Sequence, residues 1–307
     1  MVTEAAASVV IACHTEERFD QLLAAIRSAS EQQPAPDQVI IAVDHNPTLS
    51  DRLRSEVDGI EVVDHQGDRG ASGTRNAGAT RAHSPYLVFL DDDVWAHPGW
   101  LAALLAPFSD PRVVGTGGMT MAAWQGLRPP WFPDEFGWVV GASHAGLPTE
   151  EAPVRNVWSE NMAVRKHAFD AVGGFRSGFG KVGSTSRPED TDFCIRVGAS
   201  APDSHWTYVP SAVVDHAVPL QRSTFRFFLR RCYWEGAGKI ELSAHLGDDR
   251  DLGDERSYLT RTLPRAFARD LVSGQFRRAM AIVAGVTLAA AGGAVSLARA
   301  AATRLER

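Results

Sequence analysis

The chain has 307 residues, 44% of them hydrophobic and 22% charged. This composition supports one large or two small cores and excludes a disordered chain, a collagen-like repeat and a small disulfide scaffold. Residues 220–307 carry 15 Lys and Arg against 9 Asp and Glu, whereas residues 1–219 carry 16 against 28. An acidic body argues against a nucleic-acid partner, because nucleic-acid binding needs clustered cations. The basic C-terminal part could meet a protein partner or an anionic membrane.

The cysteines and the amino terminus indicate a reducing compartment. Cys13, Cys194 and Cys232 are an odd number and lie far apart in the sequence. The first residues lack the basic flank and apolar core of a secretory leader. We therefore expect a cytoplasmic protein.

The first 120 residues alternate short apolar runs with helical patterns, as parallel sheets with crossover helices do. Helices are predicted at Phe19 to Ser30, which has one apolar face, and at Ala71 to Ala82, whose small residues could pack closely on a sheet. The class is therefore α/β, with a ligand beyond the carboxyl ends of the strands. The predicted strands are Ser8 to Ala12, Gln38 to Val43, Ile60 to Val63 and Tyr86 to Leu90.

The remaining sequence is less regular. Residues 122–153 are rich in Pro and aromatic residues, which predicts a long surface loop or lid whose aromatic side chains either line an acceptor cleft or pack in hydrophobic burial. The chain is expected to be helical from Ser223 onward. Within that region, Ala279 to Ala298 is uncharged and could span a membrane, but Ala and Gly fit a packed or peripheral helix better. Further pieces of strand or helix are predicted at Asn156 to Val164, Lys166 to Val172, Asp190 to Val197 and Trp206 to Val209.

Three adjacent carboxylates, Asp91, Asp92 and Asp93, follow the fourth predicted strand. Like charges at this spacing repel one another, so the cluster predicts a bound cation or exposure to solvent. Oxygen ligands suit Mg²⁺ or Mn²⁺. On extended backbone Asp91 and Asp93 would point to one side and Asp92 to the other. The alternative is an acidic turn that caps the next helix.

A second acidic group, Glu189-Asp190-Thr191-Asp192, opens a predicted helix. Carboxylates in a first turn are favoured by the helix dipole, which is one explanation. The other is a general base that accepts a proton from a hydroxyl group. His216, at the end of an apolar run, could be a further metal ligand, although a lone His is more often a hydrogen-bonded structural residue.

Residues 68–78 form a glycine-rich segment that opens the second predicted helix. Gly70 and Gly73 would allow a phosphate or ribose to approach the backbone, and Arg69 and Arg75 could balance its charge. The segment matches neither a phosphate-binding loop nor a dinucleotide fingerprint, so nicotinamide chemistry is not supported.

Taken in order over residues 8–217, these motifs resemble the family 2 glycosyltransferases. The resemblance implies a GT-A nucleotide-sugar-binding fold with a mainly parallel central sheet and a helical C-terminal extension. It divides the chain into a nucleotide-sugar half (1–120), an acceptor and catalytic half (121–219) and a basic helical region (220–307). The matching segments are Ser8 to Glu16, Val43 to Asn46, Gly70 to Gly78, Asp91 to Asp93, Trp158 to Met162, Glu189 to Asp192, and His216.

The resemblance also implies roles for single residues. Asp190 would be the catalytic base, with Glu189 beside it, and Asp93, Asp91 and His216 would hold a Mg²⁺ or Mn²⁺ ion. Trp158, Glu160 and Asn161 would face the donor sugar or the acceptor. The donor nucleotide would contact Thr15, Glu16, Asp44, Arg75, Asp91 and Asp92.

The implied reaction transfers one sugar from a nucleoside diphosphate to a hydroxyl group, with inversion at the anomeric carbon. The acceptor would be a glycan, a lipid-linked compound or a small molecule of cell-envelope synthesis, used in the cytoplasm or at the inner membrane face. The segment Arg230 to Gly236 is closer to non-processive members than to processive synthases, which favours single transfers.

Two alternatives remain at this point. A phosphohydrolase of the haloacid-dehalogenase type would use Asp91 to Asp93 as its nucleophile motif and Gly247 to Asp251 as its distal acidic motif, but the first motif follows the fourth strand rather than the first. A protein that binds nucleotide sugars without catalysis would fit if the base is misplaced.

Overall fold

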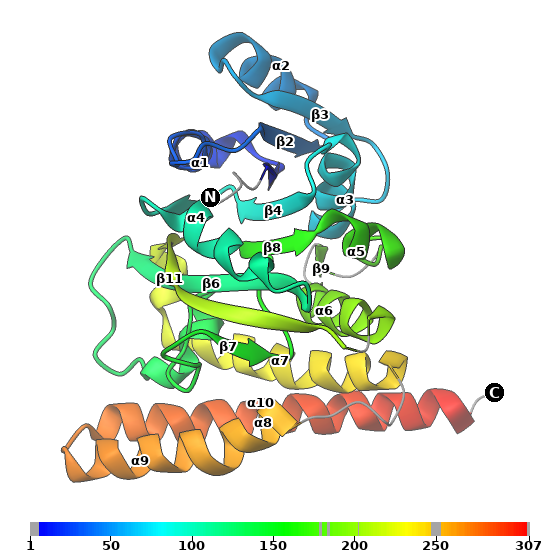
Figure 1. The fold of residues 1–307 in the computed structure, drawn as a ribbon. Helices are drawn as coiled ribbons and strands as arrows, with labels where there is room; N and C mark the ends of the chain where they lie inside the picture. The colour runs from blue at the N-terminus through cyan, green and yellow to red at the C-terminus, as the bar shows by residue number, and fades with distance from the viewer. Residues whose placement is uncertain (1–5, 178–179, 183–184, 202, 247–252, 306–307) are drawn as a thin grey trace. The chain divides into compact units, whose positions relative to one another are not determined.

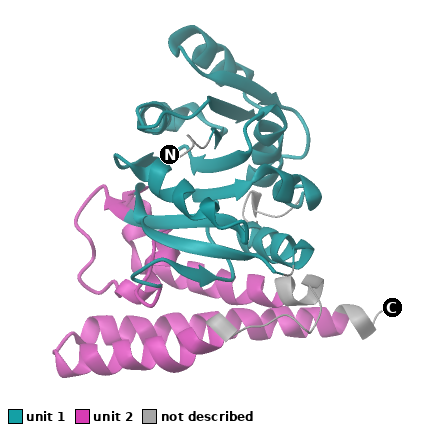
Figure 2. Cartoon of the chain, in the orientation of Figure 1, with its two compact units in different colours: residues 1–121, 148–216 teal, residues 122–147, 217–307 magenta. Residues whose placement is uncertain are grey.

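The computed structural model describes residues 6–177, 180–182, 185–201, 203–246 and 253–305. The chain forms two compact units (Figure 2). Unit 1 contains residues 1–121 and 148–216, and unit 2 contains residues 122–147 and 217–307. The chain therefore enters unit 2 twice, so these units differ from the functional division expected at 1–120, 121–219 and 220–307.

Unit 1 is built on one sheet with the strand order β3-β2-β1-β4-β8-β6-β11-β5, with β7 paired to β11 (Figure 1). Strands β3, β2, β1 and β4 are parallel neighbours, and β8 adds to β4 in the antiparallel direction. The predicted α/β class and first four strands are confirmed. The strands are β1 (Ala7–Cys13), β2 (Gln38–Asp44), β3 (Glu61–His65), β4 (Tyr86–Asp91), β5 (Val94–Ala96), β6 (Val113–Trp124), β7 (Ala152–Val154), β8 (Asn161–Arg165) and β11 (His205–Val218). A separate pair joins β9 (Gly180–Val182) and β10 (Thr185–Arg187).

The sheet is buried on both faces, which explains its continuous apolar strands. Along β1, Val9 and Ile11 belong to one hydrophobic cluster and Val10 to another. The helix α3 lies very close to the sheet, since a Cβ at Gly78 would be 2.5 Å from the Val10 Cγ1 atom. The helices of unit 1 are α1 (Phe19–Ser30), α2 (Pro47–Glu56), α3 (Ala71–Arg81), α4 (Trp100–Leu105), α5 (Lys166–Ala171) and α6 (Glu189–Ser200), with 3-10 turns η1 (Glu16–Arg18) and η2 (Ala106–Ser109).

Unit 2 is helical. Its elements are η3 (Asp134–Val140), η4 (Leu220–Ser223), α7 (Phe225–Leu246), α8 (Gly253–Ser257), the π-helical turn η5 (Tyr258–Thr262), α9 (Leu263–Val272) and α10 (Phe276–Leu305). Phe132 and Phe136 are buried in its core, and both rings contact Phe228 of α7. Of the two uses expected for the aromatic residues of 122–153, Phe132 and Phe136 therefore show hydrophobic burial and do not line an exposed cleft. Proline interrupts regular structure there, as expected, but burial of the rings is favourable and fixes the segment.

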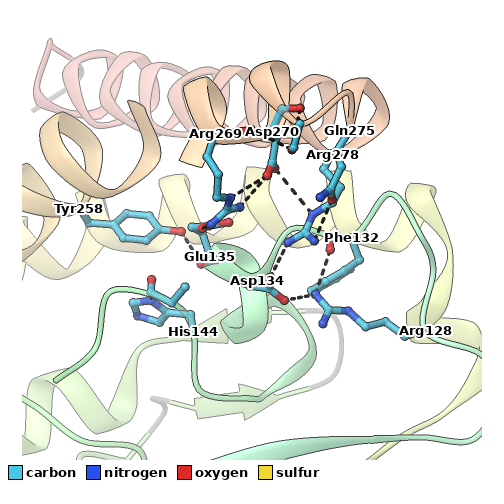
Figure 3. Close-up of polar contacts among 12 residues, drawn as sticks. Arg128, Phe132, Asp134, Glu135, His144, Tyr258, Arg269, Asp270, Gln275 and Arg278 are labelled. Carbon is cyan, nitrogen blue, oxygen red and sulfur yellow. Dashed lines mark hydrogen bonds and ion pairs between the residues drawn. The ribbon is translucent and has the colours of Figure 1, made fainter. Parts of the chain in front are cut away.

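Ion pairs also hold η3 to the C-terminal helices (Figure 3). Arg278 pairs with Asp134 at 2.5 Å, and Arg269 pairs with Glu135 at 3.1 Å and with Asp270 at 2.7 Å. The Asp270 and Glu135 side chains are 0% and 2% exposed. A buried carboxylate left without its cation typically costs about 3–5 kcal/mol, so these arginines keep residues 122–147 in place.

Helices α7 and α10 meet at glycines. A Cβ at Gly236 would lie 1.8 Å from the carbonyl oxygen of Ala289, and one at Gly292 would lie 2.0 Å from that of Tyr233. Backbone fills this space on both helices, so no side-chain movement could make room. At Gly293, one residue along, the nearest atoms to a Cβ would be 3.5 Å away.

We expect Gly292→Ala to lower the free energy of unfolding of unit 2 by about 1–3 kcal/mol, because the helices must separate. Gly293→Ala is the matched control and should be neutral or stabilising by up to about 1 kcal/mol, since alanine favours helix. Urea denaturation followed by Trp fluorescence measures both. Equal destabilisation by the two variants would contradict the close packing.

Candidate functional site

The three aspartates lie where β4 ends. Asp91 is its last residue, and Asp92 and Asp93 form the turn into β5. Arg18, at the end of η1, donates to Asp93 Oδ2 at 2.7 Å and to Asp92 Oδ2 at 2.9 Å. Asp92 and Asp93 thus share the guanidinium group of Arg18. Because the strand has ended, the expected alternation that pairs Asp91 with Asp93 on one side does not apply.

Asp91 instead meets the glycine-rich segment. Arg75 of α3 donates from Nη2 to Asp91 Oδ1 at 2.5 Å, and its Nη1 lies 3.5 Å from Glu189 Oε1. The Arg75 side chain is 5% exposed. Within the described part of the chain, its Nε and Nη1 atoms have no hydrogen-bond partner. A buried guanidinium with spare donors is suited to bind an anion such as a diphosphate.

Three more carboxyl groups join this cluster from the start of α6 and the turn before β8. Burial and, after it, the nearby Asp190 charge raise the pKa of Glu189 to about 8, while Arg75 opposes both. Burial also raises the pKa of Asp190, against the opposing influence of Arg75 and Ser159. Glu160 has its pKa raised by burial, Asp190 and Asp91. Glu189 therefore holds a proton at neutral pH that an isolated carboxyl group would have lost.

The raised pKa of Glu189 predicts that the stability of the folded chain depends on pH. Glu189 titrates near 4.5 when unperturbed and near 8 in the folded chain. Its protonated form stabilises the fold fully below pH 4.5, and this contribution is lost as the pH rises to 8. We expect Glu189→Gln to flatten the fall in stability over that window, by up to about 1.4 kcal/mol per pH unit.

Denaturation at a series of pH values measures this slope. Glu31→Gln, at an exposed position just after α1, is the control for the same chemical change. An unchanged slope in Glu189→Gln would show that Glu189 is ionised in the folded chain.

His216 of β11 is the second side chain beside Asp93 and is a candidate metal ligand. Its Nε2 atom lies 3.5 Å from Asp93 Oδ1, whereas the hydrogen bond from Arg18 goes to Oδ2. Adjacent ligands of one octahedral Mg²⁺ at ~2.1 Å would be about 3.0 Å apart. A shift of a few tenths of an ångström would therefore let both atoms bind one cation. Among the described residues, no group of three His, Cys, Asp or Glu side chains is already arranged as a metal site.

The predicted nucleotide contacts lie after β1 and β2. Asp44, the last residue of β2, accepts from the backbone N–H of Gly70 at 3.0 Å and so fixes the start of α3. Thr15 accepts from the N–H of Glu17 and caps η1. The Glu16 side chain is 40% exposed and lies 4.0 Å from Arg52.

Asn161 lies elsewhere than expected. Its side chain is buried, accepts from the Trp100 Nε1 atom at 2.8 Å, and donates to the carbonyl oxygens of Met119 and Ala212 at 3.1 Å each. These bonds join β8 to α4, β6 and β11, so the amide is a structural group and does not face a sugar. Trp158, in the turn before β8, is partly exposed.

Sequence reasoning missed Arg18. It follows Glu16 and Glu17 in a charged turn and forms no motif with the aspartates, which lie about 75 residues later. The available signal was electrostatic, because three adjacent carboxylates need a cation.

Comparison with known sequences gives a consistent result. The sequence profile of a family described as "Glycosyl transferase family 2" matches residues 8–173. A glucosyl-dolichyl phosphate glucuronosyltransferase of Haloferax volcanii is 29% identical over 237 residues, which cover 76% of this chain and 75% of that protein. A pre-mycofactocin glycosyltransferase of Mycobacterium tuberculosis is 28% identical over 68% of this chain, which spans only 43% of that protein.

Two solved structures share the fold. A mannosyltransferase from Pyrobaculum calidifontis, in complex with GDP-Man and Mn2+, aligns with a TM-score of 0.62 at 14% identity, covering 95% of this chain and 88% of that one. GalNAc-T7 with UDP, GalNAc and Mn2+ aligns with a TM-score of 0.57 at 16% identity, covering 83% and 53%. Both are glycosyltransferases solved with a nucleotide and a divalent cation.

Proposed function

This chain belongs to glycosyl transferase family 2, and we propose that it moves one sugar from a nucleoside diphosphate to an acceptor hydroxyl, with inversion and with the help of a divalent cation. The observation that carries the proposal is the position of Asp91. It pairs with Arg75, which also lies 3.5 Å from Glu189, and its charge acts on Asp92, Glu189 and Asp190. The two acidic motifs of the sequence therefore belong to one charge cluster within unit 1.

Asp93 and His216 would hold the Mg²⁺ or Mn²⁺ ion, through the two facing atoms described above. When bound there, the cation would supply positive charge to the leaving diphosphate. Arg75 would donate its Nε hydrogen, which has no hydrogen-bond partner among the described residues, to the same diphosphate. Thr15, Glu16, Asp44 and Asp92 would position the nucleotide around the carboxyl ends of the strands.

Asp190 would accept the proton of the attacking hydroxyl group. Its Oδ1 atom is buried without a hydrogen-bond partner among the described residues, so it is available to an acceptor. Burial raises the pKa of Asp190, Arg75 and Ser159 oppose that rise and favour its ionised form, and Glu189 beside it has a pKa of about 8. Attack opposite the departing diphosphate would invert the anomeric centre.

For the acceptor we propose a lipid-linked glycan at the inner face of the membrane. The name of the Haloferax relative specifies glucosyl-dolichyl phosphate, which supports a lipid-linked substrate. Glu160 and Trp158 would lie near the sugar or the acceptor, and Asn161 is left out because its amide is fully engaged. The phosphohydrolase alternative loses its support, since every relative described above is a glycosyltransferase. Its distal motif at residues 247–251 lies outside the described residues.

The test is a thermal-shift screen of the full chain against UDP- and GDP-sugars, with and without Mn²⁺, followed by product analysis with a panel of lipid-linked acceptors. We expect a rise in Tm that needs both the donor and Mn²⁺, and an inverted product by NMR. Asp110→Asn alters a partly exposed carboxylate that pairs with Arg112. It should leave donor binding and turnover unchanged, and so serves as the control for variants that remove a carboxylate of the site. Donor binding without turnover over the whole panel would favour a non-catalytic binding protein.

A further inference from the structure

Helix α10 presents a long exposed face without charge. No residue between Arg278 and Arg299 is charged, although much of this stretch is exposed. The exposed face of a helix in water normally carries charged and polar side chains. We call the large exposed residues of this helix the α10 face: Phe276, Met280, Val283, Val295 and Leu297.

The opposite side of α10 is covered by α7. The glycine contacts at Gly236 and Gly292 bring the two backbones together, and Ala281 and Ile282 are buried. Phe276–Ala302 is long and apolar enough to cross a membrane. A crossing α10 would, however, draw α7 into the hydrocarbon with it, and the turns of α7 beside Gly236 carry charged side chains, which are costly there. These are Arg230, Arg231, Glu235 and Lys239.

Aromatic and cationic residues lie at both ends of the uncharged stretch. Near its start a cavity of about 470 Å³ is lined by Trp131, Phe225, Phe276 and Arg277. Near its end a cavity of about 200 Å³ is lined by Tyr233, Trp234 and Arg299. Aromatic rings and arginines are the side chains favoured at the headgroup level of a bilayer.

The turn between α9 and α10 also exposes apolar side chains, with arginines nearby. Val272 is 91% exposed, Leu271 is exposed beside it, and α9 runs along α10 (Figure 1). On α9 and in the turn before it, Arg265 and Arg261 are exposed. The excess of 15 basic over 9 acidic residues in 220–307 makes this region complementary to an anionic surface.

We propose that the α10 face and the α9–α10 turn dock flat on a membrane that contains anionic lipids. The apolar side chains enter the boundary between headgroups and acyl chains, and Arg265 and Arg277 contact lipid phosphates. The chain lies on the membrane and does not span it. This inference goes beyond the transferase activity, because docking needs neither donor nor acceptor.

The test is sedimentation of the full chain with vesicles of phosphatidylcholine, with or without phosphatidylglycerol. We expect at least ~10-fold stronger binding to the anionic vesicles at low salt, and release by alkaline carbonate. Met280→Glu with Val283→Glu should weaken this binding by ~10-fold or more. Arg265→Gln with Arg277→Gln should remove most of the preference for anionic lipid.

Met121→Glu is the matched control, because it places the same charge at an exposed apolar position of unit 1. Circular dichroism checks that each variant folds, and a polarity-sensitive dye on Val283→Cys gives a second readout, a blue shift with anionic vesicles. Binding by the double glutamate variant at wild-type strength, or no binding to either vesicle, would overturn the proposal. Vesicle binding that resists alkaline carbonate would also overturn it, because it indicates that the helix spans the membrane. So would a chain that does not bind vesicles but forms a dimer which the two glutamates dissociate.

Discussion

Asp190→Asn is expected to lower kcat by at least ~10²-fold and to leave donor binding intact. Asparagine has nearly the same shape as aspartate but cannot accept the proton of the acceptor hydroxyl. Asp190 lies in the first turn of α6, and its Oδ1 atom has no hydrogen-bond partner in the described part of the chain, so the exchange removes a charge without breaking a hydrogen bond seen there. Steady-state kinetics together with donor titration separate the two effects.

The matched control is Asp192→Asn, in the same helical turn. The Asp192 side chain is fully buried and pairs with Arg176 and Arg196, so its loss should lower stability more than catalysis. If Asp190→Asn folds normally but no longer binds the donor, Asp190 belongs to the binding site and another group is the base.

Asp93→Ala is expected to abolish turnover that depends on Mn²⁺ and to weaken Mn²⁺ binding by ~10²-fold or more. The substitution removes the oxygen that faces His216 and also one of the two carboxylates held by Arg18. Arg18 keeps its bond to Asp92 at 2.9 Å, so the turn should stay folded. Titration with Mn²⁺ followed by electron paramagnetic resonance measures the binding without reference to activity.

Arg18→Lys is a useful comparison for Asp93→Ala. Lysine retains the charge but cannot hold Asp92 and Asp93 with two nitrogens at once. We expect weaker Mn²⁺ binding with part of the activity retained. Turnover by Asp93→Ala that equals the wild type, or that a chelator does not affect, would exclude Asp93 as a ligand of a required cation.

Much of unit 1 could be predicted from sequence because its signals are local. Strands buried on both faces are short apolar runs, and the face of α1 that carries Leu22, Ile26 and Ala29 recurs with helical spacing. Helix α2 was missed, although Asn46 caps it and Pro47 opens it. Its apolar positions are few, so its pattern is weak.

The partners of the site residues could not be predicted in the same way. Motif order placed Asp91 and Glu189 near one ligand, but only the fold shows that Arg75 contacts both. Asn161 lies in a motif that matches the family, but its side chain forms hydrogen bonds that hold the sheet together. Its partners Trp100 and Ala212 are distant in sequence, so the motif alone could not reveal this use. Motifs identify positions, whereas the use of each side chain depends on contacts distant in sequence.

The double entry of the chain into unit 2 has a practical consequence for trimming this protein. Cutting the gene after residue 216 removes α7, α9 and α10 but leaves residues 122–147 behind. Phe132 and Phe136 would then lose the ring of Phe228, and Glu135 would lose Arg269. The shortened protein would expose these aromatic side chains and leave the Glu135 carboxylate without its cation. We therefore expect it to aggregate unless residues 122–147 are replaced by a short linker.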